Sequence, residues 1–376
     1  MFKKIAAVAI VLALVFSLAA CGSGAKIVKP EKKVAVLVAP RAQYPEDYDA
    51  AMALQKKYSD NIVVKEYADS RILKAGDAEI ITLSKELAGD ADIGAIIYAR
   101  ATQFTSYAIY SAKAINPDIV TVAIEPEEKL SYVAACADVI IACDWEQAAN
   151  DIVASAKEMG ADSFFFMSIR RHLESELTSA QEGFFSAACE KNGIKYDAVN
   201  GFDPIGAEGI AKSQLVVREQ IAQAIMNKRI GEEKAALFST DSSVQSVLAE
   251  NAESRNMIYF VSNFPTAFNG IIDWCGLEIP ENIKALKKAV SGALKDKESG
   301  TFGMYNGTLM TSFVYGAAYI AFDLLNGTYA QGDEGFAESI NSRLAQAADS
   351  KTFSSKGNEE FANVFYGYDA CGYSQF

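Results

Sequence analysis

Short apolar runs alternate with helix-length segments along most of the chain, and this alternation constrains the fold more than any other feature. The first run, residues 34–38, is rich in β-branched side chains and ends before Pro40, as a buried parallel strand does. Further strands are predicted at 62–67, 93–98, 119–124 and 139–143, and helices at 47–58, 77–88 and 104–115. Strands separated by helices of this length are typical of parallel βαβ units.

A second series of the same kind begins directly after residue 143. Its strands are predicted at 163–169, 194–199, 235–239 and 257–262, and its helices at 146–159, 173–191, 207–227 and 243–251. Later helices are predicted from Pro280 to about 294, at 309–325 and at 336–348, and the aromatic tail is expected to pack on the domain. A chain of 376 residues exceeds the usual size for one hydrophobic core, so the sequence predicts an α/β fold with two doubly wound, Rossmann-like lobes.

The first twenty residues have the character of an export signal. Lys3 and Lys4 precede an uncharged apolar run, 5–20, that is short for a membrane-spanning helix. The sequence Leu-Ala-Ala-Cys ending at Cys21 resembles a lipobox, where a bacterial lipoprotein is cut after its cysteine is acylated. An ordinary signal peptide with a chance cysteine is the alternative. We expect a lipid on Cys21, a flexible tether over 21–32 and a location on the extracytoplasmic face of the cell membrane.

Charge and cysteine usage narrow the classes of function. The formal net charge is −13 at pH 7, whereas nucleic-acid binding needs concentrated Lys and Arg, so no nucleic-acid partner is expected. His172 is the only histidine, which excludes a His-rich metal site, and we expect neither a metal nor a cofactor. Five cysteines follow Cys21 without CxxC spacing, and a Cys136–Cys143 disulfide stays open.

The lipobox, the short tether, the two α/β lobes and the late return segment together resemble the type I periplasmic substrate-binding proteins, of the ribose- and galactose-binding kind. The resemblance implies a first lobe made of 33–143 and 300–327, a second lobe made of 144–299, and a tail over 328–376. It also implies a monomer that binds a small molecule in a cleft between the lobes and passes it to an ABC permease. Ligands of open α/β sheets lie outside the carboxyl ends of the strands, which agrees with that position.

Polar side chains that directly follow the predicted strands are the candidate ligand-binding residues. In the first lobe they are Arg41, Gln43, Tyr44, Arg100, Gln103 and Glu125; in the second lobe they are Arg170, Asp241 and Asn263; and the return segment adds Asn306. The loops that follow strands are favoured places for binding residues. Arginines would recognise carboxylate or phosphate groups, and aromatic and amide groups would suit a sugar or nucleoside, so the ligand is expected to be a small polar metabolite, sugar-like or anionic.

Each of these residues also has a structural interpretation. Arg41 and Arg100 could form ion pairs instead of binding a ligand. Asp241 precedes a helix and could serve as its N-cap. His172 fits a position at the start of a helix better than one at the ligand.

Three other functions stay open. An exported hydrolase is disfavoured because GxSxG, HExxH and Walker-type motifs are absent from the sequence, so we do not expect an enzyme. A ligand-sensing lipoprotein for a membrane signalling partner is an alternative that the sequence cannot separate from an importer component. A transcription regulator of the same architecture is disfavoured by the lipobox and by the absence of an N-terminal helix-turn-helix pattern.

Overall fold

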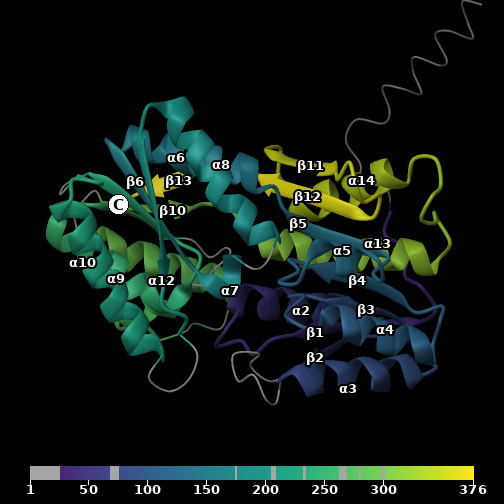
Figure 1. The fold of residues 1–376 in the computed structure, drawn as a ribbon. Coiled ribbons are helices and arrows are strands. Elements are labelled where there is room, and N and C mark those ends of the chain that lie inside the picture. The colour runs from purple at the N-terminus through teal and green to yellow at the C-terminus, as the bar shows by residue number, and fades with distance from the viewer. Residues whose placement is uncertain are drawn as a thin grey trace, which may run out of the picture.

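The structure is a computed structural model that describes residues 26–67, 76–173, 176–204, 209–231, 234–261, 269–278, 280, 282–297 and 301–376. Two α/β bodies lie side by side in Figure 1, each built on its own sheet. This confirms the predicted fold class. The predicted signal segment and Cys21 lie outside the described residues, as does Asn263.

In the first domain, seven of the described strands form a sheet in the order β11-β12-β5-β4-β3-β1-β2. The strands are β1 (Lys33–Val38), β2 (Ile62–Glu66), β3 (Ile93–Tyr98), β4 (Val120–Ile124), β5 (Val139–Cys143), β11 (Phe353–Gly357) and β12 (Val364–Asp369). The helices are α2 (Pro45–Lys57), α3 (Gly76–Gly89), α4 (Thr105–Ile115), α5 (Leu130–Ala134), α13 (Leu309–Leu325) and α14 (Phe336–Ala348). All pairs are parallel except β11 with β12. The central strands β1, β3 and β5 are almost wholly buried, which explains their continuous apolar sequences.

In the second domain, six of the described strands form a sheet in the order β13-β10-β9-β8-β6-β7. The strands are β6 (Ser163–Ile169), β7 (Lys195–Gly201), β8 (Ala235–Ser239), β9 (Ile258–Val261), β10 (Phe302–Tyr305) and β13 (Tyr373–Gln375). The helices are α6 (Trp145–Glu158), α7 (Arg170–Leu173), α8 (Glu176–Asn192), α9 (Gly209–Met226), α10 (Gln245–Arg255), α11 (Asn269–Cys275) and α12 (Ile283–Lys295), with a 3₁₀ turn η1 (Ser242–Val244). Among these described strands, only β13 runs antiparallel to its neighbour.

The late part of the chain is divided between the domains differently from the expected boundaries. Strand β10 pairs with β9 in the second sheet, so the return to the first domain begins after Tyr305 instead of at residue 300. The tail packs as expected, but it also extends both sheets: β11 and β12 join the first, and β13 joins the second. Short strands have no strong local pattern, and β12 and β13 form only because β5 and β10, much earlier in the chain, pair with them.

Helix α13 has apolar side chains around almost its whole circumference, and its packing explains why. It contacts α2 and α14 as well as the strands β3 and β4, so it is enclosed by the first domain. A helix that is apolar all round must be buried in this way. Among the described residues, no helix combines the length and hydrophobicity needed to cross a membrane.

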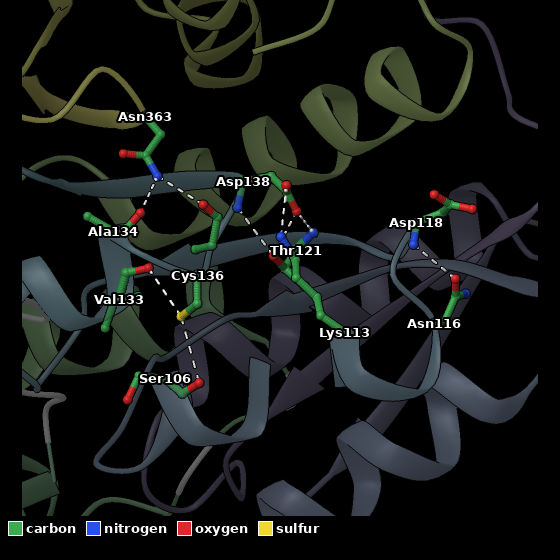
Figure 2. Close-up of polar contacts among 11 residues, drawn as sticks. Ser106, Lys113, Asn116, Asp118, Thr121, Val133, Ala134, Cys136, Asp138 and Asn363 are labelled. Carbon is green, nitrogen blue, oxygen red and sulfur yellow. Dashed lines mark hydrogen bonds and ion pairs between the residues drawn. The ribbon is translucent and has the colours of Figure 1, made fainter. Parts of the chain in front are cut away.

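Figure 2 shows how the tail is fastened beside the strands β4 and β5. Asn363, just before β12, donates from Nδ2 to the carbonyl oxygens of Ala134 and Ala137, at 3.0 and 2.9 Å. Asp138, just before β5, accepts the Thr121 amide at 2.7 Å, which fixes the start of β5 against β4. The part of the tail that leads into β12 is therefore an integral part of the first domain.

In the described part of the chain, three segments pass between the domains: residue 144, residues 306–308 and residues 370–372. Hydrogen bonds tie the second and third of these segments together. The backbone N–H of Asn306 donates to the carbonyl of Gly372 at 3.0 Å, and the Tyr305 hydroxyl donates to the carbonyl of Asp369 at 2.7 Å. Aromatic rings pack around these crossings, with the Tyr305 ring 5.9 Å from that of Tyr368.

Candidate functional site

The carboxyl ends of the first sheet bring several predicted residues together. Tyr44 follows β1, Arg100 follows β3 and Glu125 follows β4, and these strands are close neighbours in the order β4-β3-β1. Asp47, in the first turn of α2, completes the group. We call Tyr44, Asp47, Arg100 and Glu125 the strand-end cluster. This edge of an open α/β sheet is where ligands of such folds lie.

Arg100 is the centre of the strand-end cluster. Its Nε donates to Asp47 Oδ2 at 3.1 Å, and its guanidinium carbon lies 4.4 Å from the centre of the Tyr44 ring. The exposed fractions of the two charged side chains are 6% for Arg100 and 2% for Asp47. Burial alone would lower the pKa of Arg100, but the neighbouring groups, Asp47 first and then Tyr44 and Glu125, together outweigh burial and raise that pKa. Arg100 is therefore a permanent buried cation held by a carboxylate and an aromatic face.

Glu125 is a buried carboxyl in an unusual backbone conformation. Its φ is 51°, in the left-handed region that non-glycine residues seldom adopt. This turn lets Oε1 accept the backbone amide of Cys143, at the end of the neighbouring strand β5. Burial raises the pKa of Glu125 to about 7, although Arg100 and the Cys143 amide act in the opposite direction. A titratable group of this kind at a strand end is a candidate functional group.

Arg41 links the two domains. Its Nε donates to Asp49 Oδ1 at 2.6 Å, and its Nη2 donates both to Asp49 and to the carbonyl oxygen of Pro280 in the second domain. The predicted alternative of an ion pair is thus what the structure contains. A second contact between the domains joins Glu176 Oε2, at the start of α8, to the Leu130 amide at 3.0 Å.

The other two predicted residues of the first domain, Gln43 and Gln103, take part in hydrogen bonds to backbone carbonyl groups. Gln43, in the loop after β1, is buried, and its backbone N–H donates to the Pro40 carbonyl at 2.8 Å. Gln103 is half-buried and donates from Nε2 to the Glu127 carbonyl at 3.3 Å. Both lie in the loops that surround the strand-end cluster.

In the second domain, the described strand ends carry both neutral and charged polar groups. The Thr240 hydroxyl, after β8, lies 2.9 Å from the Ser168 hydroxyl and 3.0 Å from His172 Nδ1. Arg170 is exposed at the first position of α7. Asp241 accepts the Ser243 amide at 2.8 Å and is the N-cap of η1, which is the structural role that the sequence left open for it.

Asn306 lies apart from the strand-end cluster, in a crossing segment. Its Nδ2 donates to the carbonyl of Cys371 at 3.3 Å, and its Oδ1 accepts the Ser374 hydroxyl at 2.6 Å. These bonds fasten the tail to the crossing, so the structure gives Asn306 a bracing role.

Asp47 is the functional candidate that sequence reasoning missed. The sequence places it at the start of a predicted helix, where an acidic residue is ordinary. Only its spacing, three residues after the predicted Tyr44, could have marked it for attention. Its pairing with Arg100 depends on the tertiary fold, because the two residues are 53 positions apart in the chain.

The described residues contain neither a disulfide nor a group of side chains placed to bind a metal ion. The cysteines Cys136, Cys143, Cys189, Cys275 and Cys371 are free thiols in the structure, so the Cys136–Cys143 pairing that the sequence left open is not formed. Within the ranges described above, no three His, Cys, Asp or Glu side chains converge as metal ligands would.

Sequence comparison matches residues 32–303 to the family described as "Protein of unknown function (DUF3798)". Two curated relatives from Treponema pallidum (strain Nichols), each described as an uncharacterized protein, are both 26% identical to the chain, over 128 and 129 residues. Each match covers 34% of this chain, and 58% or 59% of the relative. The chain thus spans little more than half the length of the curated relatives it matches.

Solved structures share the fold over nearly the whole chain. A candidate transcriptional regulator from Clostridium difficile 630 has a TM-score of 0.67 at 18% identity, covering 93% of this chain and 99% of its own. A sugar ABC transporter structure from Actinomyces odontolyticus has a TM-score of 0.53 at 13% identity, covering 92% and 95%. A periplasmic ribose ABC transporter structure from Conexibacter woesei has a TM-score of 0.52 at 12% identity, covering 82% and 90%. The fold is therefore that of the type I periplasmic-binding and LacI-like proteins.

Proposed function

The chain belongs to the DUF3798 family, and from that premise we propose that it is an extracytoplasmic solute-binding protein that captures a small polar metabolite and delivers it to an ABC importer. Its fold is shared with periplasmic and sugar ABC transporter proteins, which supports a ligand-binding role.

The strand-end cluster is the observation that carries the proposal. Buried charged and aromatic groups gather at the carboxyl edge of a parallel sheet, where this class of fold binds its ligands. The three crossing segments and the Arg41 contact join that edge to a second domain that can close over a ligand. Domain closure would bring Arg170 and Thr240 toward the same solute.

The charges of the cluster bear on the ligand. Arg41 and Arg100 are matched by Asp49 and Asp47, so two of the three arginines that suggested an anionic ligand already have carboxylate partners. Glu125 adds a further acid at the same edge. We therefore favour a neutral, hydroxyl-rich solute over a carboxylate or phosphate, because an anion would meet the Glu125 carboxyl there and two arginines whose charge is already balanced.

The location and the mode of action belong to the same proposal. We infer that Cys21 carries a lipid that holds the protein, as a monomer, on the outer face of the cell membrane. We also infer that the protein binds its solute without transforming it. A sensory role remains the second candidate, because the candidate transcriptional regulator shares this fold over 93% of the chain.

A thermal-shift screen tests the binding role directly. Neutral sugars, nucleosides, amino acids and organic acids are added separately to the purified protein. A true ligand at about 100 times its dissociation constant stabilises the protein by about 2.7 kcal/mol, which raises the unfolding temperature measurably. A complete panel without any shift would contradict a solute-binding role. A hit whose uptake by cells is unaffected by deletion of the gene would instead contradict the importer role.

A further inference from the structure

A group of exposed lysines surrounds the point where the described chain begins. Lys26, Lys29 and Lys32 lie in the segment that leads into β1, and Lys56 and Lys57 end helix α2. All five are exposed. We call them the basic patch. Its positive charge contrasts with the chain as a whole, whose formal net charge is −13.

Contacts with aromatic rings show that the two parts of the basic patch are adjacent. The ammonium groups of Lys29 and Lys57 lie 5.7 and 5.1 Å from the centre of the same Tyr58 ring. Lys57 also donates to the Tyr319 hydroxyl at 3.2 Å and lies 5.7 Å from the centre of the Tyr315 ring. Tyr58 and Tyr319 are buried and hold the lysines on a firm base.

The leading segment is fastened to the first domain and does not hang free from it. Asn61 donates from Nδ2 to the carbonyl oxygen of Pro30 at 2.8 Å, and Asn326 donates from Nδ2 to that of Val28 at 3.0 Å. Lys29 and its neighbours therefore have a defined place on the surface of the domain. That place is where the chain leads back toward Cys21.

The lysines of the basic patch repel one another, so the patch favours the binding of negatively charged groups. Two cations share one aromatic ring, and the exposed acids Glu31 and Asp60 in the same segments are outnumbered by the five lysines. Lys33, at the start of β1, is already paired with Asp92 at 3.1 Å and is not counted. An extended array of anions outside the protein would relieve this repulsion.

We propose that the basic patch binds the anionic headgroups of the membrane in which the lipid on Cys21 is anchored, so that the first domain rests on the bilayer in a fixed orientation. This inference rests on the proposed lipid anchor. Lys26 follows Cys21 by five residues, which span at most about 18 Å of extended chain. The anchor thus holds the basic patch near the surface, where each lysine favours the bound state about fivefold, equivalent to about 1 kcal/mol.

Lysine footprinting on vesicles tests the proposal with the complete lipidated protein. The protein is reconstituted into phosphatidylcholine vesicles with or without about 30 mol% phosphatidylglycerol, a membrane with a negative surface potential. A membrane-impermeant acetylating reagent then reports the accessibility of each lysine by mass spectrometry. We expect acetylation of Lys29 and Lys56 to slow at least fivefold on the anionic vesicles and to recover in about 1 M salt, where the Debye length is about 3 Å. Lys284 and Lys288, exposed on α12 of the second domain, serve as internal controls and should react equally on both membranes.

Matched variants separate electrostatic binding from simple proximity. Lys29→Glu/Lys56→Glu should abolish the slowing at Lys32, whereas Lys284→Glu/Lys288→Glu, with the same change in charge, should leave it intact. Equal acetylation of Lys29 and Lys56 on both membranes would overturn the proposal. The same spectra show whether Cys21 is lipidated, and an unmodified Cys21 would overturn both the anchor and this inference without touching the ligand screen.

Discussion

Arg100 and Asp47 form a buried ion pair between the end of β3 and the first turn of α2, with 3.1 Å between Nε and Oδ2. The pair joins two elements that are 53 residues apart in the chain. It therefore fixes the helix after β1 against the strand beside it and shapes the edge where a solute would bind.

Removing one member of this pair should destabilise the protein. Asp47→Asn keeps the volume of the side chain but leaves the Arg100 cation without its carboxylate, and we expect a loss of about 3 kcal/mol in the free energy of unfolding. Urea denaturation measures the change. Glu250→Gln, which breaks the exposed pair with Arg218, is the control and should cost less than about 1 kcal/mol. Similar losses in the two variants would contradict the buried role of Asp47.

Glu125 should make the stability of the protein depend on pH. Burial raises the pKa of its folded-state carboxyl to about 7, above the value of 4.5 for the free group. Between these values the folded state binds more protons than the unfolded state, so stability falls as pH rises from about 4.5 to about 7. Glu125→Gln removes this titration.

The test compares the variant with the unchanged protein at pH 5 and pH 8. We expect Glu125→Gln to gain stability relative to the unchanged protein as pH rises, by on the order of 2 kcal/mol. All other titrating groups cancel in that difference. A difference that stays constant between the two pH values would show that Glu125 titrates normally.

Arg41 should influence the spacing of the two domains. Arg41→Ala removes the hydrogen bond to Pro280, and a loss of about 1 kcal/mol would shift the population toward separated domains about fivefold. The radius of gyration of the ligand-free protein, from small-angle X-ray scattering, should increase. Arg218→Ala, on an exposed pair within the second domain, should leave it unchanged. An unchanged radius in Arg41→Ala would refute the bridging role.

Glu176 offers an independent check of the same interface. Glu176→Ala removes the acceptor of the Leu130 amide and should also enlarge the radius of gyration. Glu176→Gln keeps an acceptor oxygen at the same position and should not. Identical scattering from the two variants would mean that this contact does not hold the domains together.

The tail should stabilise the second domain through Tyr373. Its ring lies 5.3 Å from that of Phe260 and 5.5 Å from that of Tyr305, measured between centres. Tyr373→Ala should lower the free energy of unfolding by about 3 kcal/mol, because a large packed ring is removed. Gln375→Ala, at an exposed position of the same strand β13, should change it by less than about 0.5 kcal/mol. Urea unfolding followed by tryptophan fluorescence measures both, and equal effects would contradict a packing role for the tail.

Much of the fold was predictable because local patterns encode it. The run at 34–38 and the helix at 309–325 appear as β1 and α13 with nearly the predicted bounds. Strand β10 was not predicted, since its Gly-rich surroundings resemble a loop. The strands of the tail were missed for a related reason: each is short, and β12 and β13 gain their stability from β5 and β10, which lie much earlier in the chain.

The candidate site was likewise predictable in part. Arg100 and Glu125 could be named because each directly follows an apolar strand, and parallel strands end at one edge. Asn306 also follows a strand, yet its side chain is hydrogen-bonded to the tail. No local sequence pattern predicts that the tail bonds to Asn306, because this contact depends on where the last residues of the chain pack.

The sequence by itself determined the order of the strands from β1 to β9 and of the longer helices, the two α/β domains and the side chains that follow these strands, because hydrophobic periodicity and turn residues act over short distances. Only the tertiary structure decided that Arg100 is neutralised by Asp47, that Arg41 reaches across to Pro280, and that the tail completes both sheets. These facts depend on which surfaces meet when helices pack on sheets, and burial then determines which charges must be paired.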